Sequence, residues 1–342
     1  MEKDPRVTVL MSVYNGERYL NEAVDSILAQ TFTDFEFLII DDASTDCTPE
    51  ILRGYDDPRI RIVTNEENLG LTKSLNRGLA LAKGEYIARM DADDISVPER
   101  LEQQIYVLEK NSDIGVLGAA VQYIDECGKP LQILKWPQKD TLIKWKLCFM
   151  NPIAHPSAII RRKLLIESGG YDEKITFAQD YDLWVRLSPA THFANHRDVL
   201  LYLRKTRDSI SFTKYHEQKM FSHLISERAI NNIIGTPMSQ SVVDCILNER
   251  INDSCTREDF QNSLKSLYYS YLLKNTEISF RDKQFMRRDI AMRAIMAENE
   301  RQNGKETWLD TVRSVAFASY YYPPSPLFML LRRLSQANNR KK

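Results

Sequence analysis

The chain alternates short apolar segments of strand length with segments of helical period, and this alternation decides its class of fold. The apolar segments are residues 7–13, 36–40, 60–63 and 86–90. Helical patterns follow at 20–28, 71–82 and 98–110. Strands that are continuously apolar are buried on both faces, which is typical of a parallel sheet with helices on each side. The sequence therefore predicts an α/β fold for this part of the chain.

Three carboxylates, Asp91, Asp93 and Asp94, follow the last of these strands directly. If residues 86–90 are extended, alternation sends Asp91 and Asp93 to the same side. Two such hard oxygen ligands can share one divalent cation. A solvated acidic turn that caps the helix beginning at Pro98 is the alternative, and for an isolated D-x-D pair it is the better interpretation.

Polar residues also follow the first two strands, at 12–15 and at Asp41-Asp42. Open parallel sheets bind their ligands at the edge formed by the carboxyl ends of the strands. The chain has no G-x-G-x-x-G after the first strand and no G-x-x-x-x-G-K-[ST], which argues against a dinucleotide site and a P-loop. A metal held by Asp93 is then the natural counter-charge for a diphosphate.

Composition limits the classes of binding partner and the cellular compartment that we expect for this chain. The net charge is -1, without the basic excess that phosphate backbones require, so nucleic acid is not an expected partner. The five cysteines are scattered and form no C-x-x-C pair, which indicates reduced thiols. The chain starts without an apolar signal segment, and no window approaches 18 apolar residues. We expect a cytoplasmic protein, either free or peripheral on the inner face of the cytoplasmic membrane.

Taken in order, the motifs of residues 7–211 resemble those of the family 2 glycosyltransferases, which have the GT-A fold. The matching segments are V-L-M-S-V-Y-N-G at 9–16, I-D-D-A-S-T-D at 40–46, N-L-G at 68–70, M-D-A-D-D at 90–94, H-P-S at 155–157, G-G-Y-D at 169–172 and D-Y-D-L-W at 180–184. Ser12 stands where the family usually has proline, and Ala43 where it has glycine. Each motif alone is weak, whereas the ordered series is specific. The resemblance implies a Rossmann-like, mixed sheet flanked by helices.

The resemblance also implies an activity. It is transfer of a sugar from a nucleotide-diphosphate sugar, most often a UDP-sugar, to a hydroxyl group with inversion at the anomeric carbon. The implied acceptor is a saccharide or a polyprenyl-diphosphate-linked saccharide of surface polysaccharide or lipopolysaccharide synthesis. The implied cofactor is Mn²⁺ or Mg²⁺. Processive members carry a Q-x-x-R-W signature and membrane spans; this chain has neither, so we expect one sugar per encounter.

Residue roles follow from the same resemblance. The donor-binding positions would be Ser12, Tyr14, Asp42, Lys73, Asp91 and Asp93. Of these, Asp93 and Asp91 would face the metal. Asp180 matches the catalytic base, and the residue before it is Gln179, where many members have a glutamate that a glutamine cannot replace in proton transfer. His155, Gln179 and Trp184 are assigned to the acceptor side, although a turn histidine without a ligand fits the pattern at 155 equally well.

In the implied mechanism, one carboxylate acts at the leaving diphosphate and the other at the attacking hydroxyl. A cation held by Asp93 stabilises the charge that accumulates on the leaving diphosphate. Asp180 accepts the proton of the attacking hydroxyl, which is too weak an acid to ionise alone. The sequence nominates no nucleophile for a double displacement, so we expect a single displacement.

Domain boundaries are expected near a shift in composition at residue 214. Residues 1–213 would form the catalytic domain, with a nucleotide half at about 1–95 and an acceptor half at about 96–213. Residues 214–342 would be mainly helical, with helices at 219–232, 240–248, 256–273 and 282–302. The tail at 308–342 is aromatic and basic, which suits an interfacial helix on an anionic membrane or a helix packed on the catalytic domain.

Two other functions compete with this one. A sugar-phosphate nucleotidyltransferase also uses an α/β sheet and metal-binding aspartates, but it needs a glycine- and arginine-rich loop after the first strand. Residues 12–18 are a poor version of such a loop. A non-catalytic nucleotide-sugar-binding module would have no need of both Asp93 and Asp180.

Overall fold

The computed structural model describes residues 4–206, 214–248 and 255–301. The chain forms two compact units, Met1–Ser222 and His223–Lys342, and the division falls within helix α9 (Tyr215–Ile234). The expected boundary after residue 213 remains an expectation, and each unit is described by itself. The aromatic and basic tail at 308–342, with its predicted membrane contact, lies outside the described residues.

The first unit is built on a nine-stranded mixed sheet, in the order β3-β2-β1-β4-β8-β6-β9-β5 with β7 paired to β6. Its strands are β1 (Val7–Val13), β2 (Phe35–Asp41), β3 (Ile60–Thr64), β4 (Tyr86–Met90), β5 (Ile95–Ser96), β6 (Ile114–Ile124), β7 (Pro130–Leu134), β8 (Ile159–Arg161) and β9 (His192–Arg204). β1 to β4 are parallel to one another, whereas β8 runs antiparallel to its neighbours β4 and β6. The sheet is therefore mixed, as the family resemblance implied, and not purely parallel.

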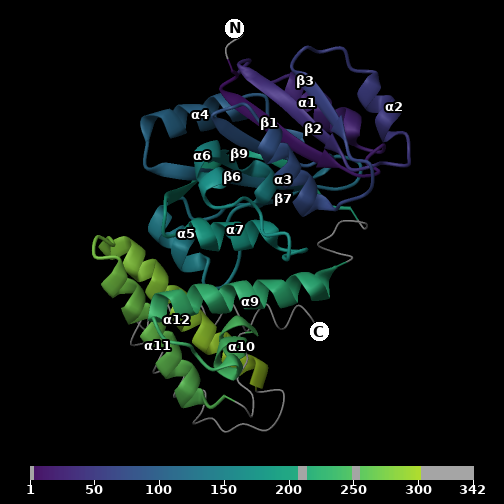
Figure 1. Cartoon of the computed structure of the whole chain (residues 1–342). Helices are drawn as coiled ribbons and strands as arrows, with labels where there is room; N and C mark the ends of the chain where they lie inside the picture. Colours follow the sequence, from purple (N-terminus) through teal and green to yellow (C-terminus); the bar gives the residue numbers. More distant parts are fainter. Residues whose placement is uncertain (1–3, 207–213, 249–254, 302–342) are drawn as a thin grey trace. The chain divides into compact units, whose positions relative to one another are not determined.

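Helices connect these strands and cover the sheet (Figure 1). They are α1 (Leu20–Leu28), α2 (Thr48–Arg53), α3 (Leu71–Leu81), α4 (Arg100–Lys110), α5 (Asp140–Lys146), α6 (Arg162–Glu167) and α7 (Gln179–Leu187), with a 3₁₀ turn at His155–Ser157. The predicted α/β class is confirmed. The short strands β5 and β7 and the helices α5 and α6 were not predicted.

The two faces of the sheet are covered by different helices because side chains alternate along each strand. Val7, Val9 and Met11 of β1 join the core formed with α1 and α4. Leu10 points to the opposite face, where α3 packs. A Cβ built on Gly78 of α3 would lie 2.3 Å from Leu10 Cδ1, so this close approach requires glycine.

The second unit contains α10 (Gln240–Asn248), α11 (Arg257–Lys274) and α12 (Phe280–Arg301), which contact one another. The predicted helices at these places are confirmed with small shifts in their bounds. Thr256 caps α11 in a capping box with Asp259, whose backbone N–H donates to Thr256 Oγ1 at 3.1 Å. Buried apolar residues of the three helices, including Ile246, Leu264 and Ile290, form the core.

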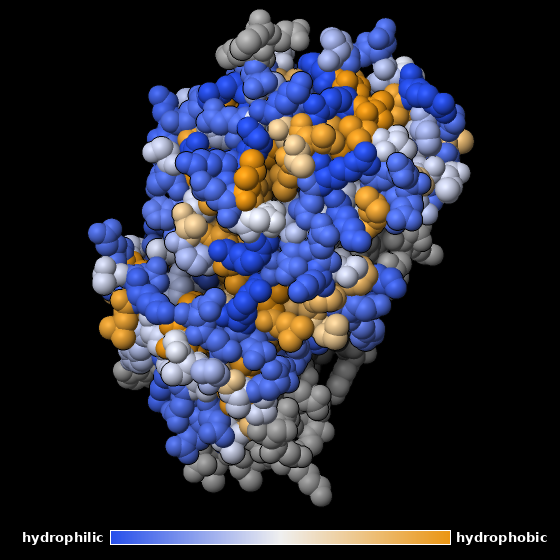
Figure 2. All heavy atoms as spheres, in the orientation of Figure 1, coloured by the Kyte–Doolittle hydropathy of each residue, from blue (hydrophilic) through white to orange (hydrophobic). Residues whose placement is uncertain are grey.

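The face of the molecule drawn in Figure 2 is mostly polar, in agreement with the composition of the chain. Hydrophilic residues cover most of the face drawn in Figure 2, and hydrophobic residues gather there in separate patches. Within the described ranges, every helix is too short or too polar to cross a membrane.

Candidate active site

The carboxyl ends of β1, β2 and β4 meet at one edge of the sheet, because these strands are adjacent and parallel. This edge carries Ser12 near the end of β1, Tyr14 just after β1, Asp42 after β2 and the acids 91–94 after β4. Tyr14 is half exposed, so its ring is accessible to a ligand. The sequence prediction that these three loops converge is therefore confirmed as geometry.

The acids after β4 occupy different environments. Asp91 is partly exposed and pairs with Arg89, whose guanidinium is fully buried. Burial, with the charge of Asp91 added, raises the pKa of Asp93 to about 6. Asp94 is buried, and burial raises its pKa well above the ordinary value. Asp91 and Asp93 are thus the members that can offer oxygens to a ligand.

Arg204, at the end of β9, fixes the backbone of this acidic turn. Its backbone N–H donates to Asp94 Oδ1 at 2.9 Å, and its Nε donates to the carbonyl oxygen of Asp93 at 2.9 Å. Its guanidinium pairs with Glu22 at 2.9 Å and stacks on the ring of Tyr19. Asp94 therefore serves to join β9 to the turn after β4.

A divalent cation fits the donor set of this turn. Two carboxylates can contribute oxygen ligands, and no group of three or more His, Cys, Asp or Glu side chains suited to a metal occurs in the part of the chain that is described. Mg²⁺ is commonly bound by one or two carboxylates together with substrate phosphates. Asp91 and Asp93 match that pattern, since the remaining ligands would come from a diphosphate and water.

Asp42 holds the loop that leads into α3. Its carboxylate accepts hydrogen bonds from the backbone N–H groups of Leu69 and Gly70, both at 2.9 Å, and from Asn65 Nδ2 at 2.5 Å. Asp42 is 2% exposed. Lys73, on the first turns of α3, is exposed. Contacts of Asp42 and Lys73 with a nucleotide remain predictions.

Asp180 lies on the first turn of α7. The N-cap of this helix is Ala178, which has a left-handed backbone with φ of 65°. The carboxylate of Asp180 accepts hydrogen bonds from the backbone N–H of Tyr181 at 2.8 Å and from Asn151 Nδ2 at 2.7 Å. Although the residue as a whole is only partly buried, burial of its carboxyl group raises its pKa to about 6. The charge of Asp91 adds to this rise.

The residues assigned to the acceptor side lie inside the unit. His155 is 7% exposed, and its Nε2 is 2.8 Å from Tyr171 Oη. Burial, together with the charge of Arg89, lowers the pKa of His155 well below its usual range, so the ring is neutral. Gln179 and Trp184 are also buried. Acceptor contacts for all three remain predictions.

Several residues that support the site escaped the sequence prediction. Arg89 carried a usable signal, because a charged side chain inside an apolar strand must find a counter-charge when it is buried. Asn151 and Arg204 carried none, since their partners come from distant parts of the chain. Tyr171 stood in the motif at 169–172, which did not reveal its contact with His155.

Comparison with known proteins identifies the family. Residues 8–169 match the family described as "Glycosyl transferase family 2". An uncharacterized glycosyltransferase of Methanocaldococcus jannaschii is 38% identical over 226 residues, covering 64% of this chain and 77% of the relative. The O-antigen biosynthesis glycosyltransferase WbnJ of Escherichia coli is 33% identical over 240 residues, covering 67% of this chain and 92% of the relative.

Solved structures share the fold. TarS of S. aureus, in complex with UDP-GlcNAc, superposes with a TM-score of 0.56 at 17% identity, covering 92% of this chain and 91% of TarS. The mannosyltransferase PcManGT from Pyrobaculum calidifontis, in complex with GDP-Man and Mn²⁺, gives 0.50 at 18% identity, covering 93% of this chain and 87% of that one. The architecture is the GT-A fold. With its motifs, sheet and relatives in agreement, the chain belongs to glycosyl transferase family 2 and is a glycosyltransferase.

Proposed function

We propose that the protein moves a sugar from a nucleotide-diphosphate sugar, with a UDP-sugar as the first candidate, to a saccharide hydroxyl by a single displacement with inversion. The observation that supports this proposal is a pair of partly desolvated carboxylates, Asp93 after β4 and Asp180 on α7, each with a pKa that burial raises to about 6. One serves the leaving group and the other the attacking group.

Asp180 is suited to the role of base. A carboxylate with a pKa of about 6 is ionised at neutral pH, and it binds a proton more readily than an ordinary aspartate. Its two hydrogen-bond donors hold the carboxylate in one orientation. Gln179, beside it, cannot exchange a proton.

Asp91 and Asp93 would hold Mn²⁺ or Mg²⁺ at the diphosphate. When bound, the cation supplies Lewis-acid stabilisation of the charge on the leaving oxygens. Arg89 keeps Asp91 oriented from inside the protein. The complex of PcManGT with GDP-Man and Mn²⁺ supports this assignment by likeness of fold.

The acceptor class is proposed from the relatives. WbnJ is named for O-antigen biosynthesis, which favours a saccharide or a polyprenyl-diphosphate-linked saccharide of a surface polysaccharide as acceptor. The complex of TarS with UDP-GlcNAc favours a UDP-sugar, and that of PcManGT with GDP-Man makes GDP-mannose the main competitor.

A thermal-shift screen tests the proposal. UDP-GlcNAc, UDP-galactose, UDP-glucose and GDP-mannose are each added with and without Mn²⁺. A true donor at about 100 times its Kd stabilises the folded state by about 2.7 kcal/mol. NMR of the product then reports the anomeric configuration. Release of pyrophosphate from a nucleoside triphosphate and a sugar phosphate would instead support a nucleotidyltransferase, and retention at the anomeric carbon would exclude the single displacement.

A further inference from the structure

The segment 168–178, between α6 and α7, leads directly to Asp180. Its backbone is irregular: Gly169, Gly170 and Ala178 all have positive φ, at 79°, 71° and 65°. Its backbone bonds are turn bonds, such as that from the Ile175 N–H to the carbonyl oxygen of Asp172 at 3.0 Å, and side chains satisfy several of its other backbone groups.

Asn76, in the middle of α3, holds this segment from one side. Its Oδ1 accepts a hydrogen bond from the backbone N–H of Tyr171, and its Nδ2 donates to the carbonyl oxygen of the same residue, both at 2.9 Å. Nδ2 also lies 3.2 Å from Glu173 Oε1. A Cβ built on Gly170 would approach Asn76 Oδ1 to 2.7 Å. The amide of Asn76 thus pairs with both backbone polar groups of one residue, Tyr171, and a side chain at position 170 would press against it.

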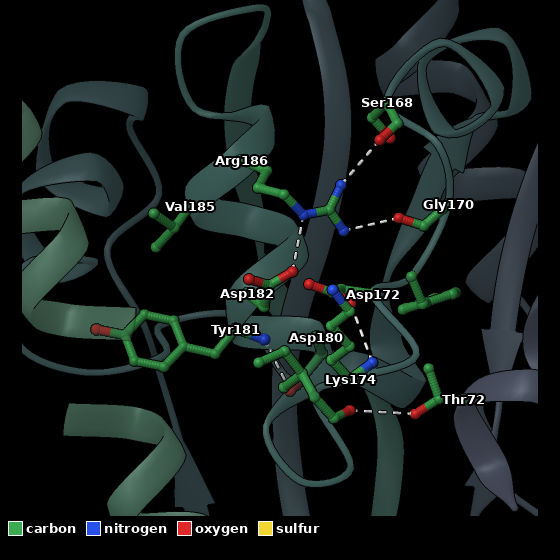
Figure 3. Close-up of polar contacts among 12 residues, drawn as sticks. Thr72, Ser168, Gly170, Asp172, Lys174, Asp180, Tyr181, Asp182, Val185 and Arg186 are labelled. Atoms are coloured by element: carbon green, nitrogen blue, oxygen red, sulfur yellow. Dashed lines mark hydrogen bonds and ion pairs between the residues drawn. The ribbon is translucent and has the colours of Figure 1, made fainter. Parts of the chain in front are cut away.

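Arg186 of α7 holds the same segment from another side (Figure 3). Its guanidinium donates to the carbonyl oxygens of Ser168 at 2.9 Å and Gly170 at 2.7 Å, and it pairs with Asp182 at 2.7 Å. Thr72, about one turn before Asn76 on α3, donates through Oγ1 to the carbonyl oxygen of Ile175 at 3.4 Å.

Tyr171 connects this segment with the reacting groups. Asn76 holds its backbone and His155 contacts its hydroxyl, while its ring is fully buried. Burial raises the pKa of the Tyr171 phenol, and the charges of Asp180 and Asp91 add to the rise. Arg186 of α7 binds the carbonyl oxygen of Gly170, next to Tyr171, so a displacement of Tyr171 would also disturb the helix that carries Asp180.

Helix α3 also carries the donor-side anchor. Gly70, its N-cap, donates its backbone N–H to Asp42. Gly70 and Asn76 are six residues apart, which on one α-helix is a rise of about 9 Å. The loop held by Asp42 and the segment before Asp180 are therefore attached to the N-terminus and the middle of the same helix.

We propose that Asn76 is a positioning residue, which sets the location of Tyr171 and hence of Asp180 relative to the donor-binding edge. The inference rests on the proposed function of Asp180. It assigns to α3 the role of fixing the position of this base relative to the donor.

The test is Asn76→Asp, which keeps the size of the side chain and the acceptor for the Tyr171 N–H. It replaces the donor with an oxygen that faces the Tyr171 carbonyl and the carboxylate of Glu173. Hydrogen exchange of peptides covering 168–178 should become at least about tenfold faster. Nucleotide release from the donor identified in the screen, with water or the acceptor, should fall by about 100-fold, as for a displacement of about 1 Å. The donor-induced thermal shift should remain unchanged.

Asn111→Asp is the matched control. Asn111 is exposed, and its Nδ2 donates to the carbonyl oxygen of Val107 at 2.8 Å, so the same substitution removes a similar bond far from the segment. It should leave exchange at 168–178 and turnover unchanged. Adding Glu173→Gln to Asn76→Asp restores a donor opposite the new carboxylate and should recover part of the lost turnover. Asn76→Ala, which introduces no charge, should show the same faster exchange.

The outcomes separate the two proposals. Unchanged exchange at 168–178 in both Asn76 variants overturns the positioning role, whatever the substrate. Faster exchange with undiminished turnover also overturns it. In the Asp180→Asn background, Asn76→Asp should cost little further turnover, and a full additional loss would mean that it does not act through Asp180. If no nucleotide sugar is bound or turned over by the unmodified protein, the proposed function fails, and the exchange comparison still decides whether Asn76 positions the segment.

Discussion

Asp180→Asn should stabilise the protein at neutral pH while it slows transfer by about 10²- to 10⁴-fold. The pKa of Asp180 is about 6 in the folded protein, against an ordinary value of 3.8. Each unit of that difference corresponds to about 1.4 kcal/mol, so the ionised carboxylate lowers the free energy of unfolding by up to about 3 kcal/mol at pH 7. The figure is an upper limit because the residue is partly exposed to solvent.

The substitution also has a cost. An amide can accept from only one of the two donors, the Tyr181 N–H and Asn151 Nδ2, that the carboxylate satisfies. One lost hydrogen bond is worth about 1 kcal/mol. The net gain should be about 2 kcal/mol at pH 7 to 8, or roughly 4 to 8 °C in Tm for a unit of this size.

The pH dependence of the difference identifies its cause. A raised pKa means that the folded state holds the proton longer than the unfolded state, so the contribution of Asp180 to stability is intact below pH 3.8 and is lost as the pH rises through about 6. Asp180→Asn should therefore be slightly less stable than the unmodified protein near pH 4 and more stable at pH 7. Urea denaturation followed by tryptophan fluorescence at both pH values measures this difference. A difference that does not vary with pH would refute the reasoning.

Asp182→Asn is the control on the same helix. Asp182 is fully buried and pairs with Arg186 at 2.7 Å, so its removal leaves a guanidinium without its carboxylate. We expect a loss of about 3 kcal/mol, opposite in sign to the effect of Asp180→Asn. If both variants were stabilised, a general benefit of removing acids from α7 would explain the result better.

Other substitutions test further parts of the site and fold. Asp93→Ala should remove the Mn²⁺-dependent part of the donor-induced thermal shift and leave the metal-independent part; an unchanged response to Mn²⁺ would show that the metal is held elsewhere. Ala43 has a left-handed backbone with φ of 59°, so Ala43→Gly should raise the free energy of unfolding by about 0.5 to 1 kcal/mol, the strain relieved less the entropy that glycine adds to the unfolded chain; a destabilised variant would contradict the assigned strain. Gly78→Ala places a Cβ 2.3 Å from Leu10 Cδ1 and should cost about 1 to 3 kcal/mol in urea denaturation, and a neutral result would mean that α3 can shift freely on the sheet.

The sequence predicted the central strands because their signal is local. β1, β2 and β4 are continuous apolar segments, buried on both faces, and their bounds agree with prediction to within a residue or so. β9, by contrast, begins at His192, in a stretch without such a signal. Its first half is rich in polar residues, and pairing with β6 in the sheet, not local preference, makes it extended.

The sequence indicated the candidate site residues that belong to recognisable motifs. It did not indicate the residues that reach the site only through tertiary contacts. The acids at 91–94 and Asp180 are visible as sequence patterns. The bond from Asn151 to Asp180 joins positions 29 apart, and that from Asn76 to Tyr171 joins positions 95 apart. Such partners are brought together only by the packing of α3 and α7 on the sheet, and no local spacing reveals them. Ala43 was noted as a departure from glycine, and its positive φ gives that departure a physical meaning.

The link between β9 and the acidic turn bears on how this protein can be recombined with its relatives. Asp94 accepts its hydrogen bond from the backbone N–H of Arg204, a donor that every residue except proline supplies. The side chain of Arg204 adds its bond to Asp93 within the same few residues. A chimera that keeps this chain through Arg204 and takes its later residues from another member therefore retains every contact described at the acidic turn. If the junction were placed before Arg204, the residue that bonds to Asp93 and Asp94 would come from the other family member, while the acidic turn itself would come from this chain.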